Sequence, residues 1–420
     1  MRSVFTEQKR VRISWTGLLV FFIIFISNDT FYFGTNINND ICSIPRYFSI
    51  LVCVILIIKA IKSYAFKLRK LALLLFTFVS LYLVACIANH DTVTYTGIYL
   101  VYILLAFLIS ITVSFRDFWR YFEKFVFFLA IISIITEVVA YVFPKIISSM
   151  PVSYNVNNVP FFYFVVGGLD LRTLGTSFIR AGSIFWEPGV WAVYLNLSLF
   201  IYIFIYKDPK LSRIIVYSLS VLLTFSTAGY FVLAYVILGF FLYKNDKKNK
   251  IPFILIIGIA MLSLLAFDSS GLFDAVFGKI QNTNEGTTMA RIGSVIVSFD
   301  MMKSNPLLGI GMSHLVEIFR SRMIAIMGVP SNDYTNGFLY CYVAYGIPFG
   351  LLSTLGFSLF SKNIQISHHS FRLYTIILFI VLFFAEHLNS PLPYIMLFYG
   401  YSSLTNSDRG KSEYEIHSIP

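Results

Sequence analysis

An arginine and a glutamate seven positions apart stand directly before a long apolar stretch, in the segment RAGSIFWEPG at residues 180–189. Charged side chains are costly beside hydrocarbon, so a pair at this place needs a physical reason. Pro188 favours the start of a helix here, because the first turn does not use the N–H that proline lacks. The segment therefore predicts a polar turn at the boundary of water and lipid, where an enzyme could meet a charged lipid headgroup.

Arginines are the side chains best suited to a diphosphate, because each guanidinium can hold two phosphate oxygens and stabilise a leaving anion. Three of them, Arg172, Arg180 and Arg291, fall in long segments between apolar runs. The alternatives are an ion pair with Glu187 for Arg180, an exposed loop charge for Arg172 and headgroup contact for Arg291. Together they are predicted to form an anion-binding group.

Glu187 is the best-placed candidate for a general base, because a carboxylate at the edge of a low-dielectric region suits deprotonation of a sugar hydroxyl near neutral pH. His314, Asp333 and His90 are other candidates. Glu137 and Glu386 lie in or beside apolar runs, where they either line a cavity or pair with a neighbouring helix. The chain has no phosphate-binding glycine loop, zinc motif or nucleophile turn, which predicts chemistry without a metal or cofactor.

The composition indicates which elements position these residues. Of the 420 residues, 57% are hydrophobic and 13% charged, so the chain is predicted to be an all-α polytopic membrane protein in one multi-pass domain, 1–420. The net charge of +11 is dispersed in short loops, which disfavours nucleic acid as a partner. Cys42, Cys53, Cys86 and Cys341 lack a metal-binding spacing and are assigned to packing.

About twelve apolar runs are long enough to cross a membrane. They fall near 15–34, 46–63, 70–88, 95–114, 122–143, 189–206, 211–226, 228–243, 251–267, 336–360, 372–388 and 391–404. With the N-terminus in the cytoplasm, 23 of the 32 lysines and arginines lie on the inner side, so both termini are predicted to be cytoplasmic.

Two long segments, 144–188 and 268–335, are then predicted as large outer loops, and function is expected there. The first is rich in turn-forming residues. In the second, a helix is expected from Thr287 or Thr288 to about Lys303, as one of several short amphipathic helices on the outer surface.

Three segments resemble the Wzy-type polymerases of the O-antigen ligase and polymerase superfamily. RAGSIFWEPG resembles their arginine-rich loop with its Glu-Pro-Gly helix start. Arg291 followed by NPLLGIG at 305–311 resembles their helix and NPLxGxG segment. Asn336 followed by Gly346 and Gly350 resembles their HN…G…G run, although Thr335 stands where the ligases have histidine, which favours a polymerase over a ligase.

The resemblance implies a GT-C-like glycosyltransferase of the inner membrane with a periplasmic active site. It would join undecaprenyl-diphosphate-linked oligosaccharides, both donor and acceptor, among membrane lipids and with a chain-length regulator protein. Catalytic roles are implied for Glu187, Arg180 and Arg291, and contacts with diphosphate or glycan for Arg172, Arg180, Arg291, His314 and Asn336. The rival functions are a flippase, disfavoured by the absence of repeated halves, an O-antigen ligase and a non-enzymatic scaffold.

Overall fold

A computed structural model provides the structure of the chain. It describes residues 14–34, 44–63, 65–143, 145, 152–153, 159–162, 166–170, 179–206, 208–244, 286–331, 334–364, 366, 369–384, 386 and 388–406. The expected span at 251–267, together with Arg172, Asp333 and Cys42, lies outside these residues.

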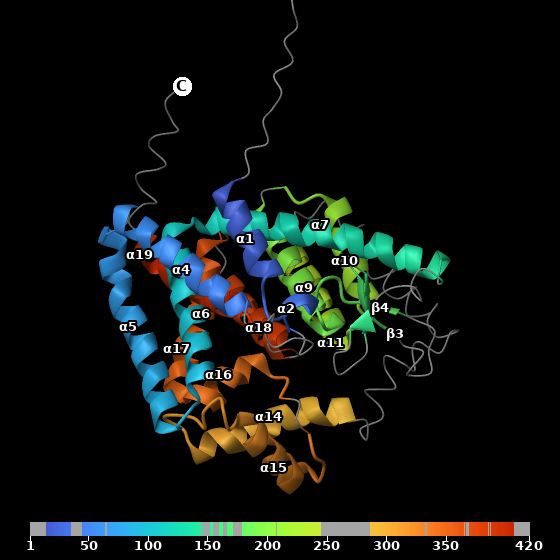
Figure 1. The fold of residues 1–420 in the computed structure, drawn as a ribbon. Helices are drawn as coiled ribbons and strands as arrows, with labels where there is room; N and C mark the ends of the chain where they lie inside the picture. The colour runs from blue at the N-terminus through green and yellow to red at the C-terminus, as the bar shows by residue number, and fades with distance from the viewer. Residues whose placement is uncertain are drawn as a thin grey trace, which may run out of the picture.

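Helices make up most of the described chain (Figure 1). Their bounds are α1 Trp15–Phe25, α2 Phe31–Gly34, α4 Ile44–Ser63, α5 Ala65–Ala88, α6 Val93–Thr112, α7 Phe115–Val142, α9 Pro188–Ile205, α10 Leu211–Leu223, α11 Thr227–Tyr243, α14 Gly286–Ser304, α15 Leu315–Met327, α16 Gly337–Tyr345, α17 Ile347–Phe360, the short 3₁₀ helix η2 Ser361–Asn363, α18 His369–Phe384 and α19 Leu392–Asn406. Figure 1 shows α14 and α15 at the end of the helix bundle opposite the start of α1.

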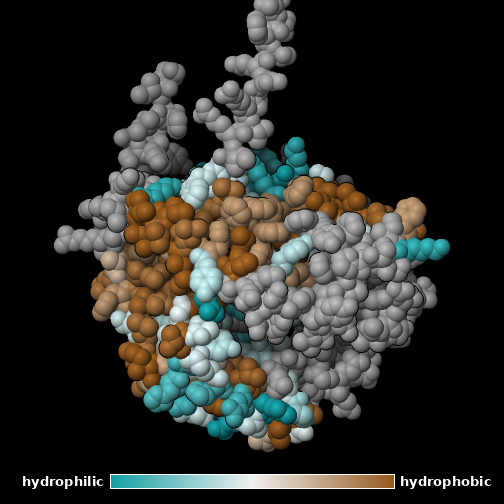
Figure 2. Space-filling view, viewed as in Figure 1, coloured by the Kyte–Doolittle hydropathy of each residue, from teal (hydrophilic) through white to brown (hydrophobic). Residues whose placement is uncertain are grey.

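Within the described residues, four helical segments are long and apolar enough to cross a membrane: Leu71–Ala88, Val93–Thr112, Phe115–Val142 and Pro188–Ile205. Shorter apolar helices accompany them, and a broad hydrophobic band covers the face drawn in Figure 2, with hydrophilic residues gathered below it over α14 and α15. The structure thus agrees with an all-α membrane protein, whereas the predicted count of twelve spans is not confirmed.

Several predicted runs are divided or shortened. The run at 15–34 becomes α1 and α2, separated by a turn at 26–30. The run at 336–360 becomes α16 and α17, separated at Gly346. The runs at 211–226 and 228–243 form α10 and α11, which have 13 and 17 residues. At a rise of about 1.5 Å per residue, α10 is only about 20 Å long, which is less than a hydrocarbon core of about 30 Å.

The first predicted outer loop adds a small antiparallel sheet to this helical fold. Its strands follow in the order β1 Val152–Ser153, β2 Val159–Phe162, β3 Val166–Asp170 and β4 Ile179–Ala181. In the last pair, Leu169 of β3 lies opposite Arg180 of β4. Strand β4 packs against α7, α9 and α10. Pro160, Gly167 and Gly168, which the sequence suggested as turn formers, lie within β2 and β3, so these paired strands were not predicted.

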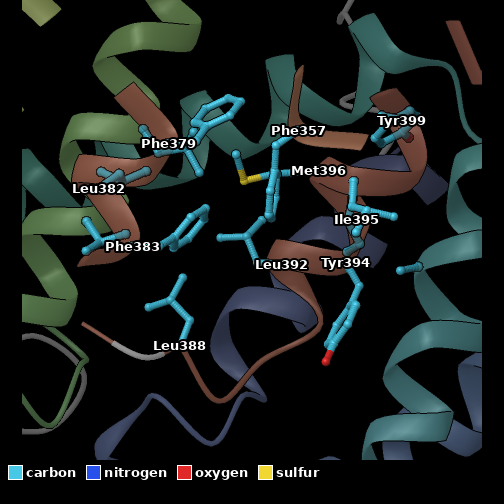
Figure 3. Close-up of a cluster of buried hydrophobic side chains, with 14 of the residues drawn as sticks. Phe357, Phe379, Leu382, Phe383, Leu388, Leu392, Tyr394, Ile395, Met396 and Tyr399 are labelled. Atoms are coloured by element: carbon cyan, nitrogen blue, oxygen red, sulfur yellow. The ribbon is translucent and has the colours of Figure 1, made fainter. Parts of the chain in front are cut away.

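Aromatic side chains fill much of the core. In Figure 3, side chains from α17, α18 and α19 and from the segment before α19 converge on one cluster. Phe357 lies with its ring centre 6.0 Å from that of Phe379 and 5.6 Å from that of Phe383. Such rings bury a large apolar area, and their edge-to-face contacts favour particular helix positions. This cluster holds the C-terminal helices against one another.

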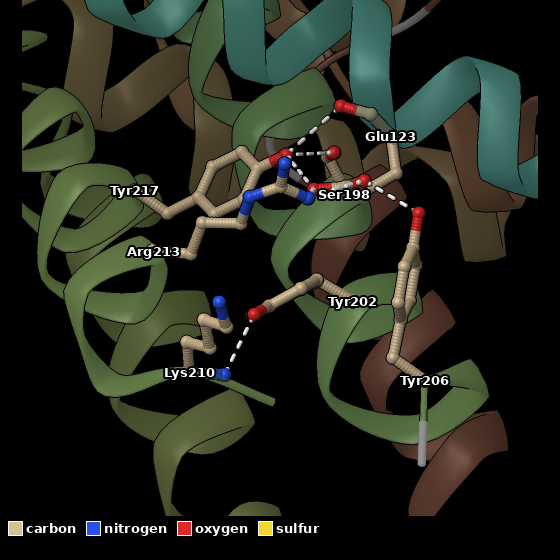
Figure 4. Close-up of polar contacts among 7 residues, drawn as sticks. All are labelled: Glu123, Ser198, Tyr202, Tyr206, Lys210, Arg213 and Tyr217. Atoms are coloured by element: carbon tan, nitrogen blue, oxygen red, sulfur yellow. Dashed lines mark hydrogen bonds and ion pairs between the residues drawn. The ribbon is translucent and has the colours of Figure 1, made fainter. Parts of the chain in front are cut away.

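A buried carboxylate, Glu123 of α7, joins three helices in a second place (Figure 4). Arg213 Nη1 of α10 donates to both of its oxygens, at 3.0 and 3.1 Å. Tyr217 and Tyr206 donate to Oε1 and Oε2 at 3.0 and 2.8 Å, and Tyr217 also exchanges a 2.8 Å hydrogen bond with Ser198 of α9. The charge is therefore paired and fully hydrogen-bonded, as a buried ion pair must be to persist.

The glycines of the segments at 305–311 and 336–350 serve a close backbone contact. Ile310 N donates to Val343 O at 2.9 Å, and Ile347 N donates to Pro306 O at 2.8 Å, so the two segments pair along their main chains. Gly346 has a positive φ of 88°, and a Cβ at this position would overlap Leu307 O. Only glycine fits both demands.

We expect Gly346→Ala to destabilise the protein by more than Gly328→Ala. Both glycines have positive φ, which costs alanine roughly 1–2 kcal/mol. A Cβ on Gly328, however, meets open space, whereas one on Gly346 meets the backbone of Leu307. Thermal unfolding of the purified variants in detergent measures the difference. Equal melting temperatures for the two variants would contradict the close contact.

Candidate functional site

Arg180 binds the tip of the hairpin formed by α10 and α11. Its Nε donates to Thr224 O at 3.1 Å, at the end of α10, where helix carbonyls carry partial negative charge. Arg180 itself is half-buried, on strand β4. The next residue of the tip, Phe225, has a positive φ of 48°. One N–H of the guanidinium therefore fixes the side chain in place, and this is a positional role that the sequence did not predict.

The segment between Arg180 and Glu187 is fixed to the turn after α1. Phe31 N donates to Ile184 O at 2.9 Å, and Thr30 and Phe185 form an isolated antiparallel bridge. Phe185 is completely buried and stacks on Tyr194 with ring centres 4.3 Å apart. The polar turn is thus a rigid part of the bundle rather than a loose loop.

Glu187 occupies the N-cap position of α9, and Pro188 stands in the first turn, as predicted. The carboxylate of Glu187 makes no capping hydrogen bond to α9, although its carbonyl accepts from Trp191 N at 3.2 Å. Glu187 is half-exposed, whereas Pro188 and the residues after it are buried. The side chain consequently lies at the edge of the packed interior, which is the position expected for a group that meets substrate.

Asp29, which sequence reasoning missed, contacts the polar turn between Arg180 and Glu187. It is 1% exposed; its carbonyl accepts from Trp186 N at 3.2 Å. Its carboxylate accepts from Asn389 N at 2.8 Å and from Tyr194 Oη at 3.2 Å. Asp29 therefore joins three segments that are far apart in the sequence.

Glu386 contributes a third carboxylate at the same place. It lies just after α18 and is 7% exposed. Its carboxylate rests against the backbone of Gly189, so closely that a Cβ on Gly189 would overlap Oε1. A side chain at position 189 would therefore displace the Glu386 carboxylate from this place.

The predicted residue Asn336 lies in a second group, at the start of α16. Its Oδ1 accepts from Leu339 N at 2.9 Å, so it caps α16, and the residue is fully buried. The preceding residues bind α14: Thr335 N donates to Ser294 Oγ at 3.4 Å, and Tyr334 exchanges a 2.7 Å hydrogen bond with Ser298. Asn336 therefore caps α16 through Oδ1, while its buried Nδ2 has no hydrogen-bond partner among the described residues.

His314 is exposed, and its Nε2 lies 3.1 Å from Asn89 O. Next to it, the backbone N–H groups of Met312 and Ser313 donate to the carboxylate of Asp91, at 3.1 and 2.8 Å. These contacts attach the 305–314 segment to the turn between α5 and α6. These contacts favour a structural role for His314, as a latch that holds the 305–314 segment on that turn, over the role of a general base.

Arg291 and the helix predicted around it belong to α14. Arg291 belongs to α14, three positions before Ser294, and its side chain lies outside the described part. In α14 the expected helix is present, with Gly286–Ser304 in place of 287–303. Val297 and Ser298 are buried, whereas Ile296 and Phe299 are about half exposed, at 45% and 53%. An apolar strip of α14 therefore faces away from the bundle.

A row of tyrosines runs between the two groups. Tyr340 of α16 lies with its ring centre 6.2 Å from that of Tyr99, and Tyr99 lies 5.9 Å from Tyr102. Asn28 Nδ2, next to Asp29, donates to Tyr102 Oη at 3.2 Å. Arg180 and Glu187 thus stand on β4 and α9, Asn336 and His314 stand on the α14–α16 side, and packed aromatic rings lie between.

The four long apolar helices in the described part of the chain agree with a multi-pass membrane protein, in which Arg180 and Glu187 stand just before and at the start of α9. Residues 189–355 match the O-antigen ligase family. The match begins at Gly189, two residues after Glu187, and includes Arg291, His314 and Asn336. This match supports the O-antigen ligase and polymerase superfamily, which the motifs of the chain predicted. No curated protein and no solved structure matches the chain.

The match also supports a general type of function. Members of the matched family are broadly glycosyl-transferring enzymes, and the similarity supports a ligase or polymerase type of function for this chain. Arg180, Glu187 and Glu386 lie outside the matched residues, so their roles rest on the geometry described above.

Proposed function

We propose that the protein is an O-antigen polymerase that joins undecaprenyl-diphosphate-linked repeat units into a long polysaccharide. The observation that carries the proposal is the fixed turn from Arg180 to Glu187, which places a guanidinium and a carboxylate at the start of the family-matching region. Transfer from a lipid diphosphate needs a cation for the leaving group and a base for the acceptor hydroxyl. Thr335 in place of a histidine supports polymerase over ligase.

In the proposed reaction, Arg180 and Arg291 bind the donor diphosphate, with Arg172 as a further contact. Glu187 accepts the proton of an acceptor sugar hydroxyl while the oxygen of that hydroxyl forms a bond to the anomeric carbon of the donor. The bond from that carbon to the diphosphate oxygen breaks, and the diphosphate leaves with its electron pair, held by the arginines. Direct displacement inverts the anomeric carbon and uses no metal. Asn336 and His314 are proposed to contact the glycan as well as to cap and latch.

The membrane setting is part of the same proposal. About twelve spans in a GT-C-like arrangement would place both termini in the cytoplasm and the site at the periplasmic face of the inner membrane. The segments 144–188 and 268–335 would be the two large periplasmic loops. The half-exposed apolar strip of α14 supports contact with membrane lipids there. A chain-length regulator protein is the proposed protein partner.

An O-antigen ligase is the second candidate, because the matched family carries that description. A gene deletion in the host separates these functions on a lipopolysaccharide gel. Loss of a polymerase leaves lipid A core that carries a single repeat unit, whereas loss of a ligase or flippase removes all repeat-bearing material. The second pattern would overturn the proposal, and the wild-type gene must restore the ladder in either case.

We expect Glu187→Gln to reduce polymer synthesis by roughly 10²–10⁴-fold, which is the usual contribution of a general base. The amide keeps the size of the side chain and does not disturb a cap, because the carboxylate makes no capping bond to α9. Chain synthesis by purified protein in nanodiscs measures the change. Glu317→Gln, at an exposed site on α15, is the matched control and should keep full activity. Full activity in Glu187→Gln would exclude the base role.

A further inference from the structure

Two carboxylates, those of Glu187 and Glu386, lie at the start of α9. The first turn of a helix has unpaired N–H groups and a partial positive charge, and an acidic N-cap residue usually satisfies them. Glu187 holds the N-cap position, yet its side chain makes no capping bond. The carboxylate of Glu386 instead lies against Gly189, the second residue of this helix, where an added Cβ would overlap Oε1 and displace it.

The position of Glu386 is fixed independently by its own segment. Three residues later, Asn389 N donates to the buried carboxylate of Asp29, and Ser390 Oγ lies 3.5 Å from Tyr194 Oη of α9. Asp29 also accepts from Trp186, next to Glu187. The segment from 386 to 390 is therefore attached to α9 and to the polar turn at several points, and Glu386 is its contact with the first turn of the helix.

We propose that Glu386 is a positioning residue for the transfer reaction: its buried carboxylate fixes the first turn of α9, and through it the backbone of Glu187. The two carboxylates thus have different roles: Glu386 positions the first turn of α9, and Glu187 accepts the proton of the acceptor hydroxyl. The inference rests on the proposed function, because it assigns a role within that reaction. It adds a segment near the C-terminus, outside the family-matching residues, to the active site.

The kinetics of Glu386 variants test this role. We expect Glu386→Ala to lower kcat roughly 100-fold with a KM unchanged within about threefold, because a displaced Glu187 impairs chemistry more than binding. Glu386→Gln keeps the volume but not the charge and should lie closer to Glu386→Ala than to wild type. Glu386→Asp, which keeps the charge on a shorter side chain, should recover part of kcat. Melting temperatures of the nanodisc samples report folding.

Gly189→Ala gives an independent approach to the same contact. The added methyl group overlaps Glu386 Oε1, so this variant should show the same loss of kcat. The double variant Gly189→Ala with Glu386→Ala should be no slower than either single variant, because both remove one contact. Additive losses, or wild-type kcat in both Glu386→Ala and Glu386→Gln, would overturn the proposal. Wild-type protein that makes no polymer from lipid-linked repeat units would instead refute the proposed function.

Discussion

Replacing Arg180 by alanine is expected to collapse the polysaccharide ladder to core bearing a single repeat unit. The change removes the cation proposed for the leaving diphosphate, for which loss of one charge-stabilising donor costs about 10²–10³-fold in rate. It also removes the hydrogen bond from Nε to Thr224 O, which fixes the tip of the α10–α11 hairpin. Lipopolysaccharide gels of a complemented deletion strain measure the result, with membrane levels of the protein measured in parallel.

Two variants distinguish the effect of losing the Arg180 charge from a nonspecific effect of removing an arginine. Arg180→Lys keeps the charge but cannot present a planar fork, so it should restore only part of the ladder. Arg116→Ala removes an exposed arginine at the start of α7 and should leave the ladder intact. An unchanged ladder in Arg180→Ala, at normal membrane levels, would remove Arg180 from the mechanism.

Replacing Glu123 by alanine is expected to lower the stability of the protein by about 3–5 kcal/mol, the usual result of breaking a buried ion pair from one side. The variant leaves Arg213, Tyr206 and Tyr217 without their shared acceptor at the junction of α7, α9 and α10. Arg213 also lies over the ring of Phe127, 4.3 Å from its centre. The melting temperature of detergent-purified protein measures the loss.

An exposed ion pair provides the matched control for Glu123. Asp300 and Arg322 are 3.1 Å apart with side chains about 40% exposed, so Asp300→Ala should cost no more than about 1 kcal/mol. Removing both partners, in Glu123→Leu with Arg213→Met, should recover much of the stability lost by Glu123→Ala. Equal losses of stability in Glu123→Ala and Asp300→Ala would show that the buried network stabilises the protein no more than an exposed ion pair does.

Helices were well predicted where a long apolar run coincides with a boundary residue. Pro188 begins α9, and Asn305-Pro306 follows the end of α14, because proline and helix geometry act within a few residues. The break at Gly346 was not predicted, although the glycine was noted. Its cause is contact with Leu307, about forty positions away, and no local pattern contains that contact.

The sequence singled out the turn from Arg180 to Glu187 but not the distant residues that pack against it. Arg180 and Glu187 stood out because charges beside an apolar run are rare. Asp29 did not, although a lone aspartate within an apolar run carries the same signal. Glu386 was noted as costly to bury, but its contact with Gly189 depends on how α18 packs beside α9. Asn336 and His314 were identified by motif, and the structure shows that the motif builds a cap and a latch.

The pairing of the 305–311 segment with residues 343–347 has a mechanical consequence. Together with the bonds from α14 to Tyr334 and Thr335 and from Asp91 to the 312–313 amides, it attaches the α14–α15 unit to the bundle at several separate points. A unit held in this way is fixed in position and does not open like a lid. Under the proposed function, a growing glycan would pass around this fixed unit, which would present a rigid surface to each new repeat.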